Sequence, residues 1–232
     1  MKKYAIIVAG GSGLRMGTTV PKQFLLLHGR PVLWYTLETF LGADSDMEIV
    51  LVVPEAHLET AGELINGLAG VGRIRLVSGG DTRFHSVRNG LEKIKERPGG
   101  MEEQAIIFVH DGVRCLVSKE LIQRCYEQAV QLGSAIPVIG SRDSVRLVKE
   151  VGSEAIDRSR VKLVQTPQTF LSHLLLPAYE ADYREAFTDD AMVVEEAGHA
   201  VHLIEGETNN IKITTPEDLL IAELLLSRFQ LP

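Results

Sequence analysis

Residues 4–17 read YAIIVAGGSGLRMG, a short apolar run that leads directly into a glycine-rich loop. The run Tyr4–Ala9 is apolar at every position but the first, as expected of a strand covered on both faces. Backbone N–H groups in such a loop can point at phosphate oxygens. A plain structural turn is the competing interpretation, because the loop has neither the GxGxxG spacing of dinucleotide sites nor the GK[ST] ending of a P-loop.

The same alternation continues outward along the chain. Apolar runs predict four strands, at Tyr4–Ala9, Glu48–Pro54, Arg73–Ser78 and Ala105–His110. Between and after them, helical spacing and capping residues predict helices that begin at Pro31, that carry Val87, Leu91 and Ile94, and that run from Ser118 to about Leu132. Further on we expect a helix over Thr188–Ala197, a strand over Ala200–Glu205 and a last helix from Thr215-Pro216 with Asp218 in a capping box. This alternation predicts an α/β fold with a mainly parallel sheet and helices on both faces.

Composition limits the classes of protein that the chain can belong to. Its 232 residues suit a single domain over 1–232, and 45% hydrophobic with 24% charged residues exclude a disordered or fibrous chain. The net charge of −7 argues against nucleic acid as a partner, so a polyanionic ligand needs a local basic pocket. No apolar run is long enough to span a membrane, and Cys115 and Cys125 lack metal-site spacing. We therefore expect a cytoplasmic protein with reduced thiols.

Chemistry-bearing residues follow three of the predicted strands, in AGGSGLRMG, SGGDTRFHS and HDGVR. Parallel strands present their carboxyl ends at one edge, where ligands bind. Arg15 and Lys22 supply positive charge beside the glycine loop, and Asp111 is a natural ligand for Mg²⁺. Solvated surface charges and a turn-forming Asp111 before Gly112 are the alternatives.

The sequence lacks the common signatures of hydrolases and zinc enzymes. It contains no GxSxG, no HExxH and no Cys/His cluster, and His110 is interpreted as structural. A phosphate monoester needs no general base, because its second pKa of about 6 leaves it largely ionised at neutral pH. Catalysis by positioning and charge neutralisation therefore agrees with the residues present.

Residues 141–164 interrupt the alternation with ten charged residues and a turn signal at Gly152-Ser153. Their rough polar and apolar alternation predicts an extended, hairpin-like arm. A long solvated loop is the alternative.

Seven motifs in order cover nearly the whole chain. They are AGGSGLRMG…PKQF, GGDTRFHSV, HDGVR, Asp157-Arg158, TPQTF, TDDA and NNIKITTPEDL. Together they resemble the 2-C-methyl-D-erythritol 4-phosphate cytidylyltransferases of the non-mevalonate isoprenoid pathway, and the ribitol-5-phosphate cytidylyltransferases are close relatives. The resemblance implies a Rossmann-like nucleotidyltransferase fold, CTP and a sugar-alcohol phosphate as substrates, Mg²⁺ as cofactor, and a homodimer embraced by the arm over 141–164.

The resemblance also implies roles for individual residues. The nucleotide would be held by Ala9, Gly10, Gly11, Gly13, Gly80, Asp81, Arg83 and Ser86. Catalysis at the α-phosphorus would fall to Arg15, Lys22 and Lys212, and the acceptor and metal side to Asp111, Arg114, Ser144, Arg158, Thr166 and Thr188. The sequence departs from the pattern of the family at two places. HDGVRCL has glycine and valine after the aspartate where alanines are expected, and Ser144 replaces an expected threonine.

Three functions fit the sequence. The first is cytidylyl transfer to methylerythritol phosphate, with ribitol phosphate as the alternative acceptor. The second is nucleotidyl transfer with another base or sugar phosphate, and the third is a regulatory protein that binds nucleotide without turnover. Pyrophosphate release separates the enzymes from the binder, which would hold CTP without consuming it.

Overall fold

The computed structural model describes residues 1–11, 20–96 and 104–229. Its central sheet is built on β1 (Lys2–Val8), β4 (Met47–Val53), β5 (Ile74–Ser78) and β6 (Ala105–Asp111), which all run parallel. These are the four strands predicted from apolar runs, and their ends differ from the prediction by at most two residues. The prediction of a mainly parallel α/β sheet is confirmed.

Four further strands extend the sheet beyond β6. They are β7 (Ser134–Gly140), β10 (Lys162–Val164), β11 (Gln168–Leu171) and β12 (Leu203–Glu205). Strand β11 lies antiparallel between β6 and β7, β10 pairs antiparallel with β7, and β12 pairs parallel with it. The predicted strand over Ala200–Glu205 is therefore shorter than expected, and β7 and β11 were not predicted.

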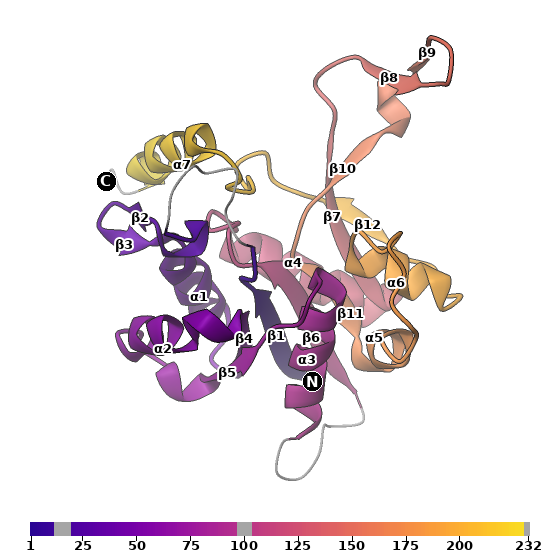
Figure 1. Cartoon of the computed structure of the whole chain (residues 1–232). Helices are drawn as coiled ribbons and strands as arrows, with labels where there is room; N and C mark the ends of the chain where they lie inside the picture. The colour runs from indigo at the N-terminus through magenta and orange to yellow at the C-terminus, as the bar shows by residue number, and fades with distance from the viewer. Residues whose placement is uncertain (12–19, 97–103, 230–232) are drawn as a thin grey trace.

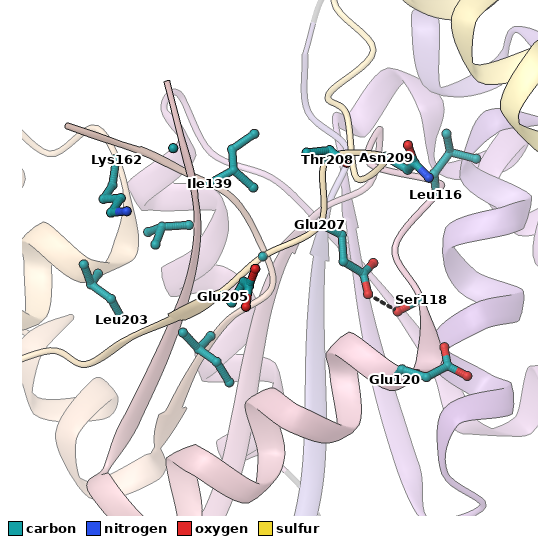
Figure 2. Close-up of a pocket in the computed structure, with 14 residues that line it drawn as sticks. Leu116, Ser118, Glu120, Ile139, Lys162, Leu203, Glu205, Glu207, Thr208 and Asn209 are labelled. Atoms are coloured by element: carbon teal, nitrogen blue, oxygen red, sulfur yellow. Dashed lines mark hydrogen bonds between the residues drawn. The ribbon is translucent and has the colours of Figure 1, made fainter. Parts of the chain in front are cut away.

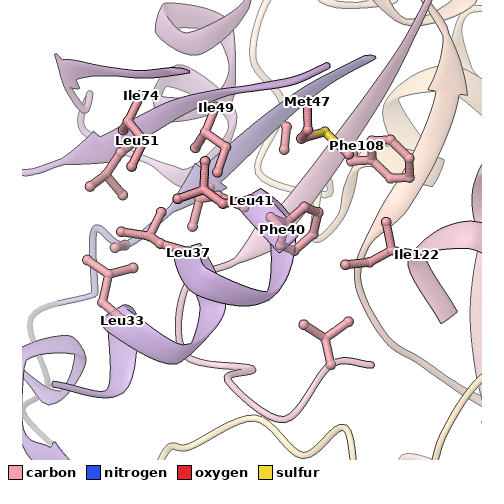
Figure 3. Packing of buried hydrophobic residues seen from close by; sticks show 14 of the residues in the cluster. Leu33, Leu37, Phe40, Leu41, Met47, Ile49, Leu51, Ile74, Phe108 and Ile122 are labelled. Carbon is pink, nitrogen blue, oxygen red and sulfur yellow. The ribbon is translucent and has the colours of Figure 1, made fainter. Parts of the chain in front are cut away.

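Helices cover both faces of the sheet (Figure 1). One face packs against α1 (Val32–Ala43), α2 (Leu58–Asn66) and α4 (Lys119–Leu132), and the other against α3 (Arg83–Lys95), α5 (Ser172–Ala178) and α6 (Asp190–Glu196). Strand β1 shows why both sides must be covered: Ala5 and Ile7 join the first core, while Tyr4 and Ile6 join the second. Figure 3 shows the first core, where Phe40 of α1 faces Phe108 of β6 with ring centroids 6.2 Å apart.

The last helix, α7 (Pro216–Phe229), has the predicted capping box. The Thr215 hydroxyl accepts from the Asp218 N–H at 3.4 Å, and Asp218 Oδ2 accepts from the Thr215 N–H at 2.9 Å. Just before it, the Ile213 N–H donates to the Val113 carbonyl, which ties this segment to the loop after β6. A small ribbon of β2 (Leu26–Leu27) and β3 (Arg30–Pro31) lies nearby, and short 3-10 turns occupy Lys22–Phe24, Glu55–His57, Val71–Arg73 and Arg158–Arg160.

The segment 141–164 forms the predicted hairpin. Strands β8 (Val145–Val148) and β9 (Ser153–Ile156) pair antiparallel, and Gly152 adopts the positive φ that the turn requires. In Figure 1 this arm projects from the body, and Val148 and Val151 are 80% and 91% exposed.

Both cysteines are buried free thiols, and burial raises the pKa of each to about 12. In the part of the chain that the structure describes, no helix is long and apolar enough to cross a membrane.

Candidate active site

The carboxyl ends of the parallel strands meet at one edge of the sheet. Val8 of β1 lies in register with both Val52 of β4 and Asp111 of β6. The following loops continue the pairing, since the Ala9 N–H donates to the Val52 carbonyl and the Gly112 N–H to the Val8 carbonyl, each at 2.8 Å. The glycine loop and the predicted metal-binding aspartate are therefore neighbours.

A first pocket of about 300 Å³ opens at this edge. Its lining includes every predicted nucleotide-binding residue that the structure describes, together with three predicted catalytic or substrate residues: Ala9, Gly10, Gly11, Gly80, Asp81, Arg83, Ser86, Lys22, Asp111 and Lys212. Lys22 is only 9% exposed and lies beside the glycine loop. Its closeness is shown by Gly11, where an added Cβ would stand 3.4 Å from Lys22 Cε. Next to it, the Gln23 amide donates to the Ala9 carbonyl at 2.8 Å and fixes the loop's first residue.

The second glycine segment is fixed against the start of α3. A Cβ at Gly80 would come within 2.5 Å of the His85 Cβ, so only glycine fits there. The Gly80 N–H donates to the Ser86 hydroxyl at 3.2 Å, and the Thr82 hydroxyl caps the helix by accepting from the His85 N–H. These contacts hold Asp81 at the mouth of the first pocket.

A second pocket of about 290 Å³ lies alongside the first. It contains the predicted acceptor-binding residues Arg114, Thr166 and Thr188. Arg83, Asp111 and Lys212 line both pockets. The two pockets thus meet at one carboxylate and two cations.

Asp111 is surrounded by positive charge. Its Oδ2 lies 2.8 Å from Lys212 Nζ and 3.7 Å from Arg114 Nε, and its Oδ1 accepts from Arg83 Nε at 3.4 Å. Burial by itself raises the pKa of Asp111, but the charges of Arg83, Lys212 and Arg114 outweigh burial and hold that pKa well below its usual range. The carboxylate is therefore ionised at neutral pH.

His110 is a structural residue, as its burial suggests. Its Nε2 donates to the Arg114 carbonyl at 3.2 Å, which leaves Nδ1 to accept from the Thr166 hydroxyl at 3.0 Å. That hydroxyl in turn accepts from the Asp111 N–H at 3.1 Å. Burial lowers the pKa of His110 to about 3, so the ring is neutral and supports both Asp111 and Thr166.

A buried carboxylate that contacts the site was not predicted from the sequence. Asp190, the first residue of α6, is fully buried and binds both terminal nitrogens of Arg83, at 2.9 and 2.6 Å. The sequence signal was only that Asp190 belongs to the TDDA motif.

Two of the described residues that were predicted for the site do not line the two pockets. Ser144 and Arg158 lie on the arm, where Arg158 donates to the Arg142 carbonyl at 2.9 Å, and neither lines either pocket. Gly13 and Arg15 lie outside the described residues.

A larger hollow of about 840 Å³ lies between β7, β10, β12 and the start of α4 (Figure 2). Figure 2 shows Glu207 bonded to Ser118 on one wall, with Leu203 and Lys162 on the opposite side. None of the predicted site residues that the structure describes lines it.

A parallel sheet whose carboxyl edge carries a glycine loop and paired basic pockets defines a nucleotide-binding α/β protein. The 2-C-methyl-D-erythritol 4-phosphate cytidylyltransferase family model matches residues 4–228, so the chain belongs to that family. The cytidylyltransferase of that name from Phocaeicola vulgatus is 47% identical over 226 residues, spanning 97% of this chain and 100% of the relative.

Solved structures agree with the family. The 4-diphosphocytidyl-2C-methyl-D-erythritol synthase of Anaerococcus prevotii superposes with a TM-score of 0.81 at 31% identity, covering 98% of this chain and 96% of that one. The 2-C-methyl-D-erythritol 4-phosphate cytidylyltransferase of Thermus thermophilus gives 0.73 at 30% identity, covering 98% and 100%. The Rossmann-like nucleotidyltransferase fold is confirmed.

Proposed function

We propose that this chain transfers the cytidylyl group of CTP to 2-C-methyl-D-erythritol 4-phosphate in the cytoplasm. A phosphate oxygen of the acceptor attacks the α-phosphorus of CTP, the bond from that phosphorus to the bridging oxygen breaks, and pyrophosphate leaves. The observation that carries this proposal is the pair of adjoining pockets that share Arg83, Asp111 and Lys212. Two substrates held on either side of that junction would meet there, which is the main requirement of a displacement that needs little covalent chemistry from the protein.

The first pocket suits the nucleotide. Backbone N–H groups at Gly10 and Gly11 and the ammonium of Lys22 are donors and charge for a triphosphate. Because Lys22 is nearly buried, its charge is weakly screened and acts strongly on charge that develops on the phosphates. Arg15, two residues after Gly13 in sequence, would add a second positive charge. The same loop includes Gly13.

The second pocket suits the acceptor phosphate. Arg114 is held by a bond of 2.8 Å from its Nη1 to the Asn210 carbonyl, which orients the guanidinium in the pocket. Thr188 lines the same pocket, and the Thr166 hydroxyl has one lone pair left after its contacts with Asp111 and His110. Because the acceptor phosphate is already ionised, these residues need only bind and orient it.

The donor chemistry of the junction fits Mg²⁺. Mg²⁺ is usually bound by one or two carboxylates together with substrate phosphates and water. Asp111 is ionised, lines both pockets, and has in Oδ1 an atom whose described contact is the 3.4 Å bond from Arg83. The described residues hold no cluster of three potential protein ligands, so the phosphates would supply the remaining coordination. When bound, the metal would neutralise charge on the leaving pyrophosphate.

We further propose that the arm completes the acceptor pocket of a second copy in a homodimer. Arg158 and Ser144 lie outside both pockets of their own chain, although an arginine is well suited to bind a phosphate with paired hydrogen bonds. The arm's exposed valines lack a partner surface in their own chain. A two-fold dimer would place each arm on its neighbour.

The experiment is a pyrophosphate-release assay with CTP and Mg²⁺. We expect turnover with 2-C-methyl-D-erythritol 4-phosphate and slower turnover with ribitol 5-phosphate. Faster turnover with ribitol 5-phosphate would overturn the acceptor assignment. CTP binding without pyrophosphate release from either acceptor would favour the regulatory protein instead.

A further inference from the structure

Asp190 occupies a position in the protein interior that its charge would normally forbid. Its side chain is fully buried at the start of α6, 107 residues along the chain from Arg83. Burying a carboxylate without a partner is strongly unfavourable, so its partners define what it does. We propose that Asp190 is a positioning residue that holds the Arg83 guanidinium at the junction of the two pockets.

The contacts between the two side chains fix both the place and the orientation of the guanidinium. Asp190 Oδ1 accepts from Arg83 Nη1 at 2.9 Å, and Oδ2 accepts from Nη2 at 2.6 Å. This paired geometry matches the planar fork of arginine and leaves it little rotational freedom. Nε donates to Asp111 at 3.4 Å, and each terminal nitrogen keeps one further N–H.

Asp190 is itself held rigidly. The Tyr179 hydroxyl donates to its Oδ1 at 2.6 Å, and burial raises the pKa of Tyr179 well above its usual value, so the hydroxyl keeps its proton. The first turn of α6 is fastened to β11, because Gln168 accepts from the Ala191 N–H at 2.8 Å and donates to Asp189 at 3.1 Å. The orientation of Arg83 is thus set by the body of the protein.

The consequence for the site concerns Asp111. Arg83 has two carboxylates within reach, and without Asp190 both of its terminal nitrogens would be free to bind Asp111. A paired contact there would occupy both Asp111 oxygens and turn the guanidinium out of its present position. Asp190 therefore keeps Arg83 available to ligands in both pockets. It also limits the contact between Arg83 and Asp111 Oδ1 to the 3.4 Å bond from Nε.

The test compares Asp190→Asn with wild type, each with and without Arg83→Ala. The asparagine keeps the shape but has one acceptor oxygen for three donors, two on Arg83 and one on Tyr179. We expect kcat/KM to fall about 10- to 100-fold, as when a partner that orients a site residue is removed. In the Arg83→Ala background the same substitution should change kcat/KM less than about threefold, because positions that act through one another are not additive.

Three further measurements separate positioning from a loss of fold. Val194→Ala removes a buried methyl pair from the same helix without touching the network, and should leave kcat/KM within about threefold. Tyr179→Phe keeps the ring stacked on Phe84 at 4.8 Å and removes only the bond to Asp190, so it should repeat the effect more weakly if Asp190→Asn does not fold. Calorimetric affinity for CTP, measured without acceptor, gives a readout that does not depend on turnover.

The inference rests on the proposed function, and the two fail differently. A wild type that releases no pyrophosphate would refute the function, while the CTP affinities would still test the positioning. Equal losses from Asp190→Asn with and without Arg83, in an active protein, would show that Asp190 acts independently of Arg83 and would overturn the inference.

Discussion

Sharing of the active site between two chains leads to a sharp prediction. Arg158 is on the arm and lines neither pocket of its own chain, whereas Lys212 lines both and lies 2.8 Å from Asp111. In the proposed dimer each site combines the body of one chain with Arg158 of the partner subunit. A heterodimer of Arg158→Ala and Lys212→Ala would therefore have one site with both lesions and one site with neither.

The magnitude follows from random pairing. Two inactive variants unfolded, mixed in equal amounts and refolded give about half heterodimers, and one of the two sites in each is intact. About a quarter of all sites should then be active. We expect pyrophosphate release by the mixture to recover to roughly a quarter of that of refolded wild type, with the heterodimer fraction measured by native mass spectrometry.

A matched pair serves as control. Lys22→Ala and Lys212→Ala both lie on the body, where each site takes both residues from the same chain, so their mixture should stay inactive. If the Arg158 and Lys212 mixture is equally inactive although heterodimers form, Arg158 serves its own chain and the shared site is wrong. If no dimer of the wild type is detected, the arm has another role.

Three further predictions concern two residues that line the pockets, Lys22 and Asp111. Lys22→Ala should lower kcat by about 10²–10³ with little change in KM for CTP, since its charge should act mainly on the transition state; a raised KM with unchanged kcat would contradict that role. Asp111→Asn should lose more turnover at limiting than at saturating Mg²⁺, and identical Mg²⁺ titrations would argue against a metal ligand. Because the pKa of Asp111 is lowered in the folded state, its charge stabilises the fold fully above the pKa of the unfolded chain. In urea titrations the gap in unfolding free energy between wild type and Asp111→Asn should start to narrow below about pH 5 and keep narrowing as pH falls towards the lowered folded-state pKa, and a constant gap would contradict this.

Local signals account for the parts of the fold that could be predicted. Runs such as Ala105–His110 are apolar on every face because the strand is covered on both sides, and a capping box such as Thr215–Asp218 is complete within four residues. Strand β11 has no such signal. It is four residues long, and its buried Gln168 and Thr169 are polar, so nothing local distinguishes it from a loop. Its place between β6 and β7 depends on pairing with distant strands.

The same distinction applies to the site. Residues after strands could be predicted to converge, because parallel strands end at one edge whatever their order. The pair Asp190 and Arg83 could not be predicted, because no periodicity relates positions 107 residues apart. Thr166 is intermediate: its place in the second pocket agrees with the resemblance, but its hydroxyl is largely used by His110 and Asp111.

Charge explains why the described residues alone cannot form the whole site. A chain with net charge −7 was expected to need a local basic pocket, and the two pockets together are lined by Lys22, Arg83, Arg114 and Lys212. Three carboxylates, Asp81, Asp111 and Asp189, line them as well, so the described lining has an excess of only one positive charge.

A triphosphate and a phosphate monoester together bring about six negative charges at neutral pH. Neutralising them in a partly buried site requires further cations, and the proposal identifies three: Mg²⁺ at Asp111, Arg15 beside the glycine loop, and Arg158 of the partner subunit. Each of these is therefore expected to matter most when both substrates are bound, since the negative charge then exceeds by the widest margin what the described pockets can balance.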